Sequence, residues 1–286
     1  MKFTNKYNLP QTVFDVLAKD GYKAGNDDYS ATSLLKSPRQ LLLYRRHFHQ
    51  IEEDVSDRVW SIFGQAAHNI LEKHGNDTSL TEERLYTEVL GRKLSGQVDH
   101  YHEGVITDYK VTSVWSIVYK SKIEDWTAQL NIYAYLFRKN GYDVRRLQIV
   151  AVLRDWSETE KLRSRDYPEA PIVVIPITLW DIEDQELSIT SKIKEFIEAE
   201  SLTDDELPYC TPEERWQAPD VYAVMKEGRK TAVKLYDNEE EAEIHASEDK
   251  KYSVVKRSGT SRNCERYCPV SFCCNQYAQL VKRNDS

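Results

Sequence analysis

Apolar residues recur at every third or fourth position in several segments of the chain, a spacing that places them on one face of a helix. One such segment is 58–75, where Val59, Ile62, Phe63, Ala66 and Ile70 follow it. The same pattern predicts helices over 11–20, 33–49, 123–139, 179–201 and 239–248. Thr32 or Ser33 is a suitable N-cap for the helix over 33–49, and Asn140-Gly141 ends the helix over 123–139.

Alternating or continuous apolar runs predict strands at 85–94, 97–101, 105–111, 146–154 and 172–178, the last two buried. Because these strands are interspersed with helices, the pattern indicates an α/β core in which helices flank a mixed sheet. We expect this core to occupy 1–203. A second lobe, 204–286, then contains a hairpin of 221–226 and 231–236, a short helix, a strand at 252–257 and a cysteine-rich segment.

Composition adds limits on the class of protein. Of the 286 residues, 40% are hydrophobic, which is enough for a buried core. No run approaches the about 18 apolar residues of a membrane-spanning helix, and the first residues lack the apolar region of an export signal. We therefore expect a cytoplasmic protein without a membrane segment.

The net charge of −8 is unevenly distributed. Residues 201–250 contain 6 Lys and Arg against 14 Asp and Glu, whereas 251–286 contain 7 against 2. A second basic stretch comprises Arg39, Arg45, Arg46, His47 and His49. Since local charge attracts phosphates, the acidic total excludes a uniformly basic nucleic-acid coat but not a nucleic-acid site near these two stretches.

The five cysteines are concentrated near the C-terminus: Cys210, Cys264, Cys268, Cys273 and Cys274. An odd number of cysteines without an export signal disfavours a set of structural disulfides. Four thiolates can instead surround one metal centre, and we assign to it Cys210, Cys264, Cys268 and one of the adjacent pair. Either Cys273 or Cys274 can be this fourth ligand, and we take Cys274. The alternative is a group of ordinary buried thiols.

A second group of polar residues lies in a predicted hairpin. One strand contains Gly96-Gln97-Val98-Asp99, and the other contains Val105-Ile106-Thr107-Asp108-Tyr109-Lys110. A two-residue turn at Glu103-Gly104 pairs positions that sum to 207, which places Asp99 opposite Asp108. Lys110 projects from the same face as Asp108. Two carboxylates and a backbone carbonyl suit a hard ion such as Mg²⁺. The alternative is a solvated hairpin with surface charges.

Two predicted helices carry further candidates. His68 lies one turn after Gly64 on a mostly apolar helix, and is either a packed core histidine or a metal ligand, with the glycine permitting close approach of another backbone. Gln129 and Tyr133 are four residues apart and therefore share a helix face. This pair is either plain helix surface or an amide and a phenol directed at a phosphate or a base.

Taken in order, Gly64-x-x-x-His68, Gly96-x-x-Asp99, Asp108-x-Lys110 and Gln129-x-x-x-Tyr133 resemble the RecB-like branch of the PD-(D/E)XK nuclease superfamily. Residues 29–39 are similar to the first helix of that branch. The cysteines resemble those of its iron–sulfur members, among them AddB-type helicase–nucleases and CRISPR-associated exonucleases; small phage-encoded exonucleases look alike too. The likeness spans 29–139 and, through the cysteines, extends to about 277. It implies a restriction-endonuclease-like core.

The resemblance also implies roles for individual residues. His68, Asp99, Asp108 and the carbonyl of Tyr109 would hold Mg²⁺ or Mn²⁺, Lys110 would be the catalytic lysine, and Gln129 and Tyr133 would fix the DNA or the lysine. Glu88 is a weaker acidic candidate. Iron–sulfur relatives place a first cysteine beside a Pro-Arg pair in the first helix. Here that position is Ser37, so we expect Cys210 to replace it.

The function that this likeness implies is a metal-dependent DNA exonuclease, of use in DNA recombination and repair, with a structural [4Fe-4S] cluster. Zn²⁺ is the alternative at the cysteines. DNA, single-stranded or double-stranded with ends, would be the substrate, with recombination or replication proteins or a second copy of the chain as partners. A phage-encoded protein would act in the host cytoplasm. The competing hypotheses are a non-catalytic cysteine-metal module that binds nucleic acid and an iron–sulfur redox protein.

Overall fold

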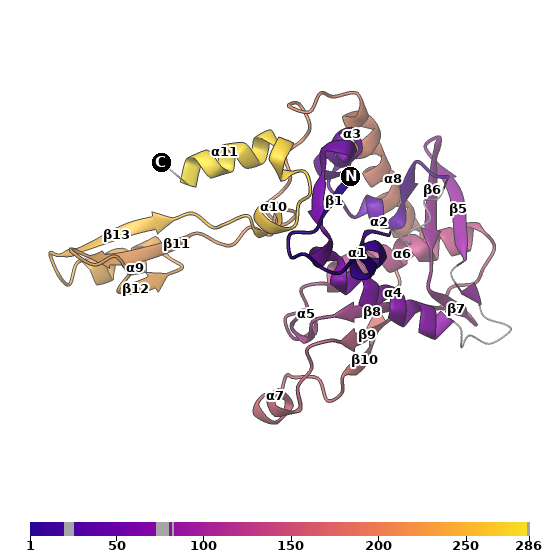
Figure 1. The fold of residues 1–286 in the computed structure, drawn as a ribbon, viewed down its shortest axis with the longest axis horizontal. Helices are drawn as coiled ribbons and strands as arrows, with labels where there is room; N and C mark the ends of the chain where they lie inside the picture. Colours follow the sequence, from indigo (N-terminus) through magenta and orange to yellow (C-terminus); the bar gives the residue numbers. More distant parts are fainter. Residues whose placement is uncertain (20–25, 73–79, 82, 285–286) are drawn as a thin grey trace. The chain divides into compact units, whose positions relative to one another are not determined.

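The computed structural model describes residues 1–19, 26–72, 80–81 and 83–284 (Figure 1). The chain divides into two compact units, each built from two separate stretches. The first unit consists of Met1–Lys36 and Glu52–Ser201, and the second of Ser37–Ile51 and Leu202–Ser286. The short stretch Ser37–Ile51, which the sequence pattern groups with the N-terminal core, thus belongs to the unit that carries the cysteines.

The first unit contains a mixed sheet of five strands in the order β10-β9-β8-β7-β4. β8 and β9 are parallel, and the other neighbours are antiparallel. A second sheet has the order β2-β6-β5, and β1 pairs with β3. The strands are β1 (Lys2–Thr4), β2 (Tyr29–Ser30), β3 (Glu52–Asp54), β4 (Leu80–Thr81), β5 (Arg84–Val89), β6 (Arg92–Gln97), β7 (His100–His102), β8 (Val105–Thr112), β9 (Arg146–Leu153) and β10 (Ile172–Ile177).

The helices of this unit confirm the mixed α/β class that the pattern predicts. They are α1 (Gln11–Ala18), α2 (Ala31–Leu34), α4 (Val59–Glu72), α5 (Val114–Val118), α6 (Ile123–Lys139), α7 (Glu158–Arg163) and α8 (Ile182–Glu200), with a 3₁₀ turn, η2 (Val55–Arg58). α6 is central, because an unbroken run of its side chains from Gln129 to Phe137 is buried. α8 contributes Ile189, Ile193 and Phe196 to the same core.

Two local predictions are wrong. The segment 85–94 is not one strand but most of a hairpin, since Leu90 and Gly91 both have positive φ, 51° and 70°, and reverse the chain between β5 and β6. The segment 33–49 is not one helix either. Ser30, rather than Thr32 or Ser33, caps α2 in a capping box with Ser33, and a new helix starts at Pro38.

Two apolar surfaces are more exposed than their patterns indicate. On α4, Phe63 and Ile70 are 55% and 62% exposed, although both follow the helical spacing of a buried face. β10 lies at the edge of its sheet, and Ile172 and Val174 on it are exposed, which corrects the prediction of a buried strand. An edge strand has a neighbour on one side only, so its outer side chains have fewer partners.

The second unit consists of helices around the cysteines and a small sheet. Its helices are α3 (Pro38–His47), α9 (Glu239–Ala246), α10 (Arg262–Arg266) and α11 (Asn275–Asn284), with 3₁₀ turns η1 (Phe48–Gln50) and η3 (Ser271–Cys273). The antiparallel sheet has the order β12-β11-β13, and α9 lies beside it (Figure 1). These strands, β11 (Val221–Lys226), β12 (Lys234–Tyr236) and β13 (Tyr252–Arg257), confirm the predicted hairpin, with a shorter second strand.

Two adjacent backbone segments, 217–220 and 258–261, connect this sheet to the cysteine-bearing helices. The amide of Ala218 donates to the carbonyl of Thr260 at 3.0 Å, and the amide of Gly259 donates to the Asp220 carboxylate at 2.9 Å. A Cβ at position 259 would lie 1.6 Å from the carbonyl oxygen of Ala218, so only glycine fits at this crossing of two backbone segments.

In the described residues, no helix is both long enough and apolar enough to cross a membrane.

Gly96 marks the point where β6 lies directly against α6. A Cβ at this position would be 2.5 Å from Leu136 Cδ1 and 2.8 Å from Tyr133 Cδ1. At Gly64 the situation is opposite, because a Cβ there would have no described atom within 4 Å. Close approach therefore explains the glycine at 96, and the proposed close approach of another backbone at 64 has no counterpart in the described residues.

We predict that Gly96→Ala lowers the free energy of unfolding by about 1–3 kcal/mol, because the added methyl group overpacks the contact with α6. Gly64→Ala, in the open middle of α4, is expected instead to stabilise by roughly 0.5–1 kcal/mol through its higher helix propensity. Urea denaturation followed by circular dichroism measures both. Equal effects of the two substitutions would contradict the packing explanation.

Candidate functional site

The predicted hairpin forms with the predicted register. His100 pairs with Thr107, Tyr101 with Ile106 and His102 with Val105, so paired positions sum to 207. Glu103 and Gly104 form the turn, with φ of 46° and 79°. Asp99 directly precedes β7, and extending the register places it opposite Asp108.

Asp99 contacts β8 at the residue that follows Asp108. The amide of Tyr109 donates to Asp99 Oδ2 at 2.7 Å, which fixes one oxygen of that carboxylate. The Asp108 side chain is only 3% exposed, and its Oδ2 pairs with Lys110 Nζ at 2.7 Å. Burial and the nearby Asp99 carboxylate raise the pKa of Tyr109. The arrangement therefore joins Asp99, Asp108, Tyr109 and Lys110 in a single polar site.

The parallel neighbour β9 shapes the environment of this site. Asp108 and Lys110 lie beside Ile149 and Ala151, both of which are fully buried. The lysine side chain is 26% exposed, so its ammonium group reaches solvent above a carboxylate that does not. Charges interact more strongly where water is excluded. The buried Asp108 carboxylate therefore fixes the position of the Lys110 ammonium group.

The other candidates from the sequence have different surroundings. Gln129 and Tyr133 are buried on α6, and the Gln129 amide donates to the Tyr133 hydroxyl at 2.8 Å. They are therefore not an exposed helix surface. Glu88 is exposed on β5, opposite Lys93 of β6, in the other sheet of the unit. His68 belongs to α4, but its side chain lies outside the described residues.

The donors at the hairpin fit a hard divalent ion. Mg²⁺ is bound through one or two carboxylates, with water and substrate phosphate completing its shell. Asp99 and Asp108, with the carbonyl of Tyr109, supply oxygen donors of that kind. Among the described residues, however, no three His, Cys, Asp or Glu side chains already converge on one point as metal ligands do. The carboxylate pair is therefore an incomplete shell by itself.

All five cysteines are free thiols, and all lie in the second unit. Burial, followed by the thiols of Cys268, Cys210 and Cys274, raises the pKa of Cys264 to about 12. Burial also raises the pKa of Cys210, with Cys274 and Cys268 contributing to the increase. Burial and then the thiol of Cys274 likewise raise the pKa of Cys273 to about 11, with a smaller contribution from Cys268. Cys273 is held differently, with its thiol directed at the carbonyl of Val270 at 3.4 Å.

The first turn of α3 provides polar contacts to these thiols. Ser37 Oγ lies 3.1 Å from Cys210 Sγ, Arg39 Nη1 lies 3.9 Å from Cys274 Sγ, and Gln40 Nε2 lies 4.0 Å from Cys268 Sγ. Thiol donors suit zinc and iron–sulfur clusters alike. A four-iron cluster takes one thiolate per iron, so its ligands need not converge on a single ion.

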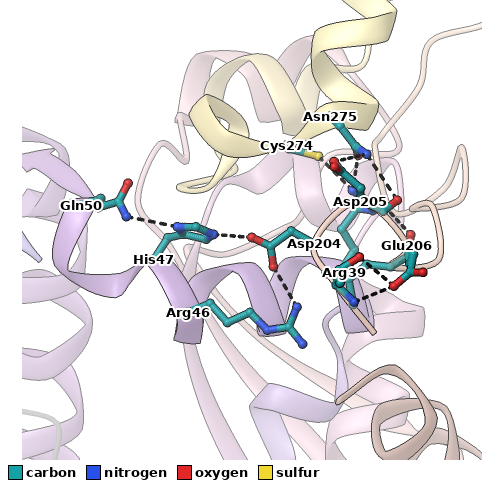
Figure 2. A network of polar contacts seen from close by, with 11 residues as sticks. Arg39, Arg46, His47, Gln50, Asp204, Asp205, Glu206, Cys274 and Asn275 are labelled. Atoms are coloured by element: carbon teal, nitrogen blue, oxygen red, sulfur yellow. Dashed lines mark hydrogen bonds and ion pairs between the residues drawn. The ribbon is translucent and has the colours of Figure 1, made fainter. Parts of the chain in front are cut away.

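Figure 2 shows the buried arginine that holds this turn in place. Arg39 is 1% exposed, which removes it from the basic surface expected around residues 39–49. Its guanidinium donates to the carbonyls of Leu207 and Pro208 and, at 2.6 Å, to Asn275 Oδ1, and it lies over the ring of Tyr209. These acceptors carry no charge, so the positive charge of Arg39 persists beside the cysteines.

Sequence reasoning missed this role for Arg39 and assigned it to surface charge. The available signal was local: Pro38 and Ser37 mark a helix start, and the buried apolar residues Leu41–Leu43 show that the same helix faces a core. A second ion-pair group in Figure 2 lies at the end of α3, where Arg46 Nη1 and His47 Nε2 bind Asp204 at 2.8 and 2.6 Å.

No protein-family model matches this chain, and no curated protein matches it. Among solved structures, it is similar to the protein designated SSO0001, with 17% identity and a TM-score of 0.42, over 64% of this chain and 83% of that one. It is also similar to a phage-related exonuclease from Haemophilus somnus 129PT, with 14% identity and a TM-score of 0.29, over 64% and 75%. Both TM-scores are below 0.5, so neither likeness carries an argument about function.

We predict that Arg39→Lys destabilises the protein by roughly 1–3 kcal/mol, because an ammonium group cannot reach all the carbonyl and amide oxygens that the guanidinium satisfies. Arg45→Lys makes the same chemical change at an exposed position of the same helix and serves as the control. Thermal and urea unfolding compare the two variants. If Arg45→Lys is as destabilising, the buried contacts of Arg39 do not explain the loss.

We predict a smaller and pH-dependent effect for Asp204→Asn. Hydrogen bonds from Arg46 and then His47 lower the pKa of Asp204 from its ordinary value of 3.8. A carboxyl with a lowered pKa stabilises the fold above the ordinary value, and this contribution is lost as pH falls through the lowered one. For a partly exposed pair, the loss in Asp204→Asn at pH 7 is a few tenths to about 1 kcal/mol.

Urea unfolding of wild type and Asp204→Asn between pH 7 and pH 3 measures this prediction. The difference between the two proteins should shrink below pH 4. A difference that grows on acidification would contradict the assignment of the lowered pKa to the ion pairs.

Proposed function

We propose that this protein is a divalent-metal-dependent nuclease that hydrolyses phosphodiester bonds of DNA from an end. The observation that carries the proposal is the arrangement of Asp99, Asp108, the Tyr109 backbone and Lys110 on one hairpin. Two carboxylates beside a lysine suit the hydrolysis of a phosphate ester, because that reaction needs both a metal site and a fixed cation.

Each residue has a distinct task in this proposal. Asp99 and Asp108 would hold Mg²⁺ or Mn²⁺ with the Tyr109 carbonyl. When bound, such an ion would lower the pKa of a water molecule and offset charge on the phosphate. The Tyr109 amide keeps one oxygen of Asp99 in place. Lys110, already oriented by Asp108 at 2.7 Å, presents its ammonium group to the attacked phosphate.

Gln129 and Tyr133, the buried pair on α6, would support the segment that carries Asp99. Gln129 and Tyr133 bond to each other, and Tyr133 packs on Gly96, three residues before Asp99. We propose that they fix the position of the segment leading to Asp99 or bind DNA. His68 remains a proposed metal ligand, and Glu88, exposed on β5, a weaker acidic candidate.

The cysteine site is proposed as a structural metal centre with Cys210, Cys264, Cys268 and Cys274 as ligands. A [4Fe-4S] cluster is the first choice and Zn²⁺ the alternative. The contact of the Cys273 thiol with the carbonyl of Val270 supports Cys274 as the fourth ligand. A protein that only binds nucleic acid through such a centre would have no use for the Asp108–Lys110 pair.

We predict that Asp108→Asn and Lys110→Met each lower the rate of DNA hydrolysis by about 10²–10³-fold or more, because the first weakens the proposed metal site and the second removes the cation beside the attacked phosphate. The control is the exposed ion pair Lys122–Asp125, with 3.7 Å between the charged atoms, changed to Asp125→Asn and Lys122→Met. End-labelled linear DNA and circular DNA are incubated with Mg²⁺ or Mn²⁺, with and without EDTA.

We expect the wild type to degrade linear but not circular DNA. This activity should be lost with EDTA and in both hairpin variants, Asp108→Asn and Lys110→Met. Circular dichroism shows that the variants fold. Full activity of Asp108→Asn would refute the metal assignment, and DNA binding without hydrolysis by the wild type would favour the non-catalytic module.

A further inference from the structure

Two exposed aromatic side chains follow closely after the strand that carries Asp108 and Lys110. β8 ends at Thr112, and α5 begins two residues later, with Trp115 in its first turn and Tyr119 as its C-cap. The two rings are stacked, with 5.6 Å between their centroids and 19° between their planes. Trp115 is 44% exposed and Tyr119 is 71% exposed. Neither ring has a task in the hydrolysis proposed above.

The backbone that carries this stacked pair is fixed at both ends of α5. At the first end, Asp155 accepts hydrogen bonds from Ser113 Oγ at 2.6 Å and from the amide of the next residue at 2.7 Å. At the other end, the Tyr119 amide donates to the carbonyl of Trp115 at 3.0 Å, and Lys120 ends the helix with a φ of 52°. A ligand that stacks on the rings therefore meets an ordered helix, which lowers the entropy cost of binding.

A buried tyrosine supports the indole ring of Trp115 from one side. Tyr167 is 4% exposed and meets Trp115 edge-on, with 6.0 Å between the ring centroids and 76° between the planes. The Tyr167 hydroxyl accepts from the Ser157 amide at 2.9 Å and lies 3.4 Å from the carbonyl of Asp155. A further planar group would extend the stack on Tyr119, the ring with the larger exposed fraction.

Thr112 connects α5 to the face of β8 that carries the proposed site. Asp108, Lys110 and Thr112 are alternate residues of one strand, so their side chains lie on the same face. Thr112 Oγ1 donates to Ser116 Oγ, in the middle of α5, at 3.2 Å. Because a strand rises about 3.3 Å per residue, Thr112 lies only about 7 Å beyond Lys110 along β8. The stacked pair is therefore within reach of a DNA strand bound at the site.

Basic side chains accompany the rings. β8 and β9 are parallel, so they end at the same edge of the sheet, and the amide of Arg154 donates to the carbonyl of Thr112 at 3.0 Å. The Arg154 guanidinium lies 4.4 Å from the ring centroid of Trp60 on α4, a side chain that is itself 52% exposed. Lys120, which directly follows the stacked pair, is exposed as well. With Lys110, these cations suit the phosphates of a strand whose bases stack on aromatic rings.

We propose that Trp115 and Tyr119 form a platform for an unpaired base, so that the hairpin site takes DNA from a single-stranded end. The inference rests on the proposed function and adds the form of its substrate. Aromatic rings bind any base through its π face, which gives affinity with little sequence preference. A base inside a duplex must first be unpaired and unstacked at a cost in free energy, so the platform favours single-stranded DNA.

The test separates the rings from the charges. The full-length chain is titrated, with EDTA to prevent hydrolysis, into three fluorescently labelled DNAs of equal length: a single strand, the same strand built from abasic sites, and a blunt duplex. Fluorescence anisotropy measures binding by the wild type, Trp115→Ala, Tyr119→Ala and Tyr119→Phe. The control is Tyr7→Ala, because Tyr7 lies in the same unit and has the same exposed fraction as Tyr119, 71%.

We expect Trp115→Ala and Tyr119→Ala each to weaken binding of the single strand by about 5–100-fold, the loss typical of one base that no longer stacks on an aromatic ring. Tyr119→Phe, which keeps the ring, and Tyr7→Ala should bind the single strand like the wild type. The abasic strand keeps its phosphates but has no bases, so it should bind the wild type and Tyr119→Ala equally. The blunt duplex should bind the wild type more weakly than the single strand.

Unchanged binding of the single strand by Tyr119→Ala would overturn the inference, as would an equal loss in Tyr7→Ala, an equal loss on the abasic strand, or tighter binding of the duplex by the wild type. Circular dichroism checks folding. If Trp115→Ala unfolds, Tyr119→Ala and Tyr119→Phe decide the question, because this ring is largely exposed.

Failure of the proposed function gives a different result. A wild type that binds the single strand through these rings, but does not hydrolyse it with Mg²⁺ or Mn²⁺, would refute the nuclease and leave the platform. A wild type that hydrolyses DNA and whose Tyr119→Ala variant binds and cleaves the single strand at the wild-type level would refute the platform and leave the nuclease.

Discussion

The second unit depends on the buried guanidinium of Arg39. A charged group at 1% exposure is unfavourable unless its hydrogen-bond donors are satisfied, and here carbonyl and amide oxygens from residues 207, 208 and 275 accept them. Those acceptors lie 168 to 236 residues after the arginine, which belongs to α3. The requirement to satisfy this one side chain therefore ties α3 to the C-terminal segment, and it brings Ser37 and Gln40 to the thiols.

The carboxylate site of the first unit follows a related principle at shorter range. Asp108 is buried on a central strand, and its charge is matched by Lys110, which lies two residues further along the same strand. Asp99 is held by the amide of the residue between them. Both sites thus place a charged side chain in a water-poor environment and orient it with neighbours, but the carboxylate site does so with adjacent residues and the cysteine site with residues far apart in sequence. In our proposals, the first site acts on DNA and the second stabilises the fold.

Particular elements show how far the sequence can be interpreted. The bounds of α6 agree with the predicted 123–139, because a long amphipathic pattern and an Asn-Gly stop point to the same helix. The prediction of one strand over 85–94 is wrong because its strand-like residues continue through the turn at Leu90-Gly91, where an apolar residue takes a positive φ. The break before Pro38 is visible as a Ser-Pro pair, yet the apolar spacing on both sides favours one helix. His68 and the assignment of metals remain predictions.

The sequence by itself determined the hairpin that carries Asp99, Asp108 and Lys110, since a two-residue turn at Glu103-Gly104 leaves one register and alternation then sets the face of every side chain. It also determined the α/β class, because the helical and the strand spacing of apolar residues are both local patterns. Only the tertiary structure decided that α3 joins the unit with the cysteines and that Ser37 lies 3.1 Å from Cys210. Those contacts depend on hydrogen-bond acceptors some 170 residues away, and no local pattern specifies which distant carbonyl will satisfy a buried arginine.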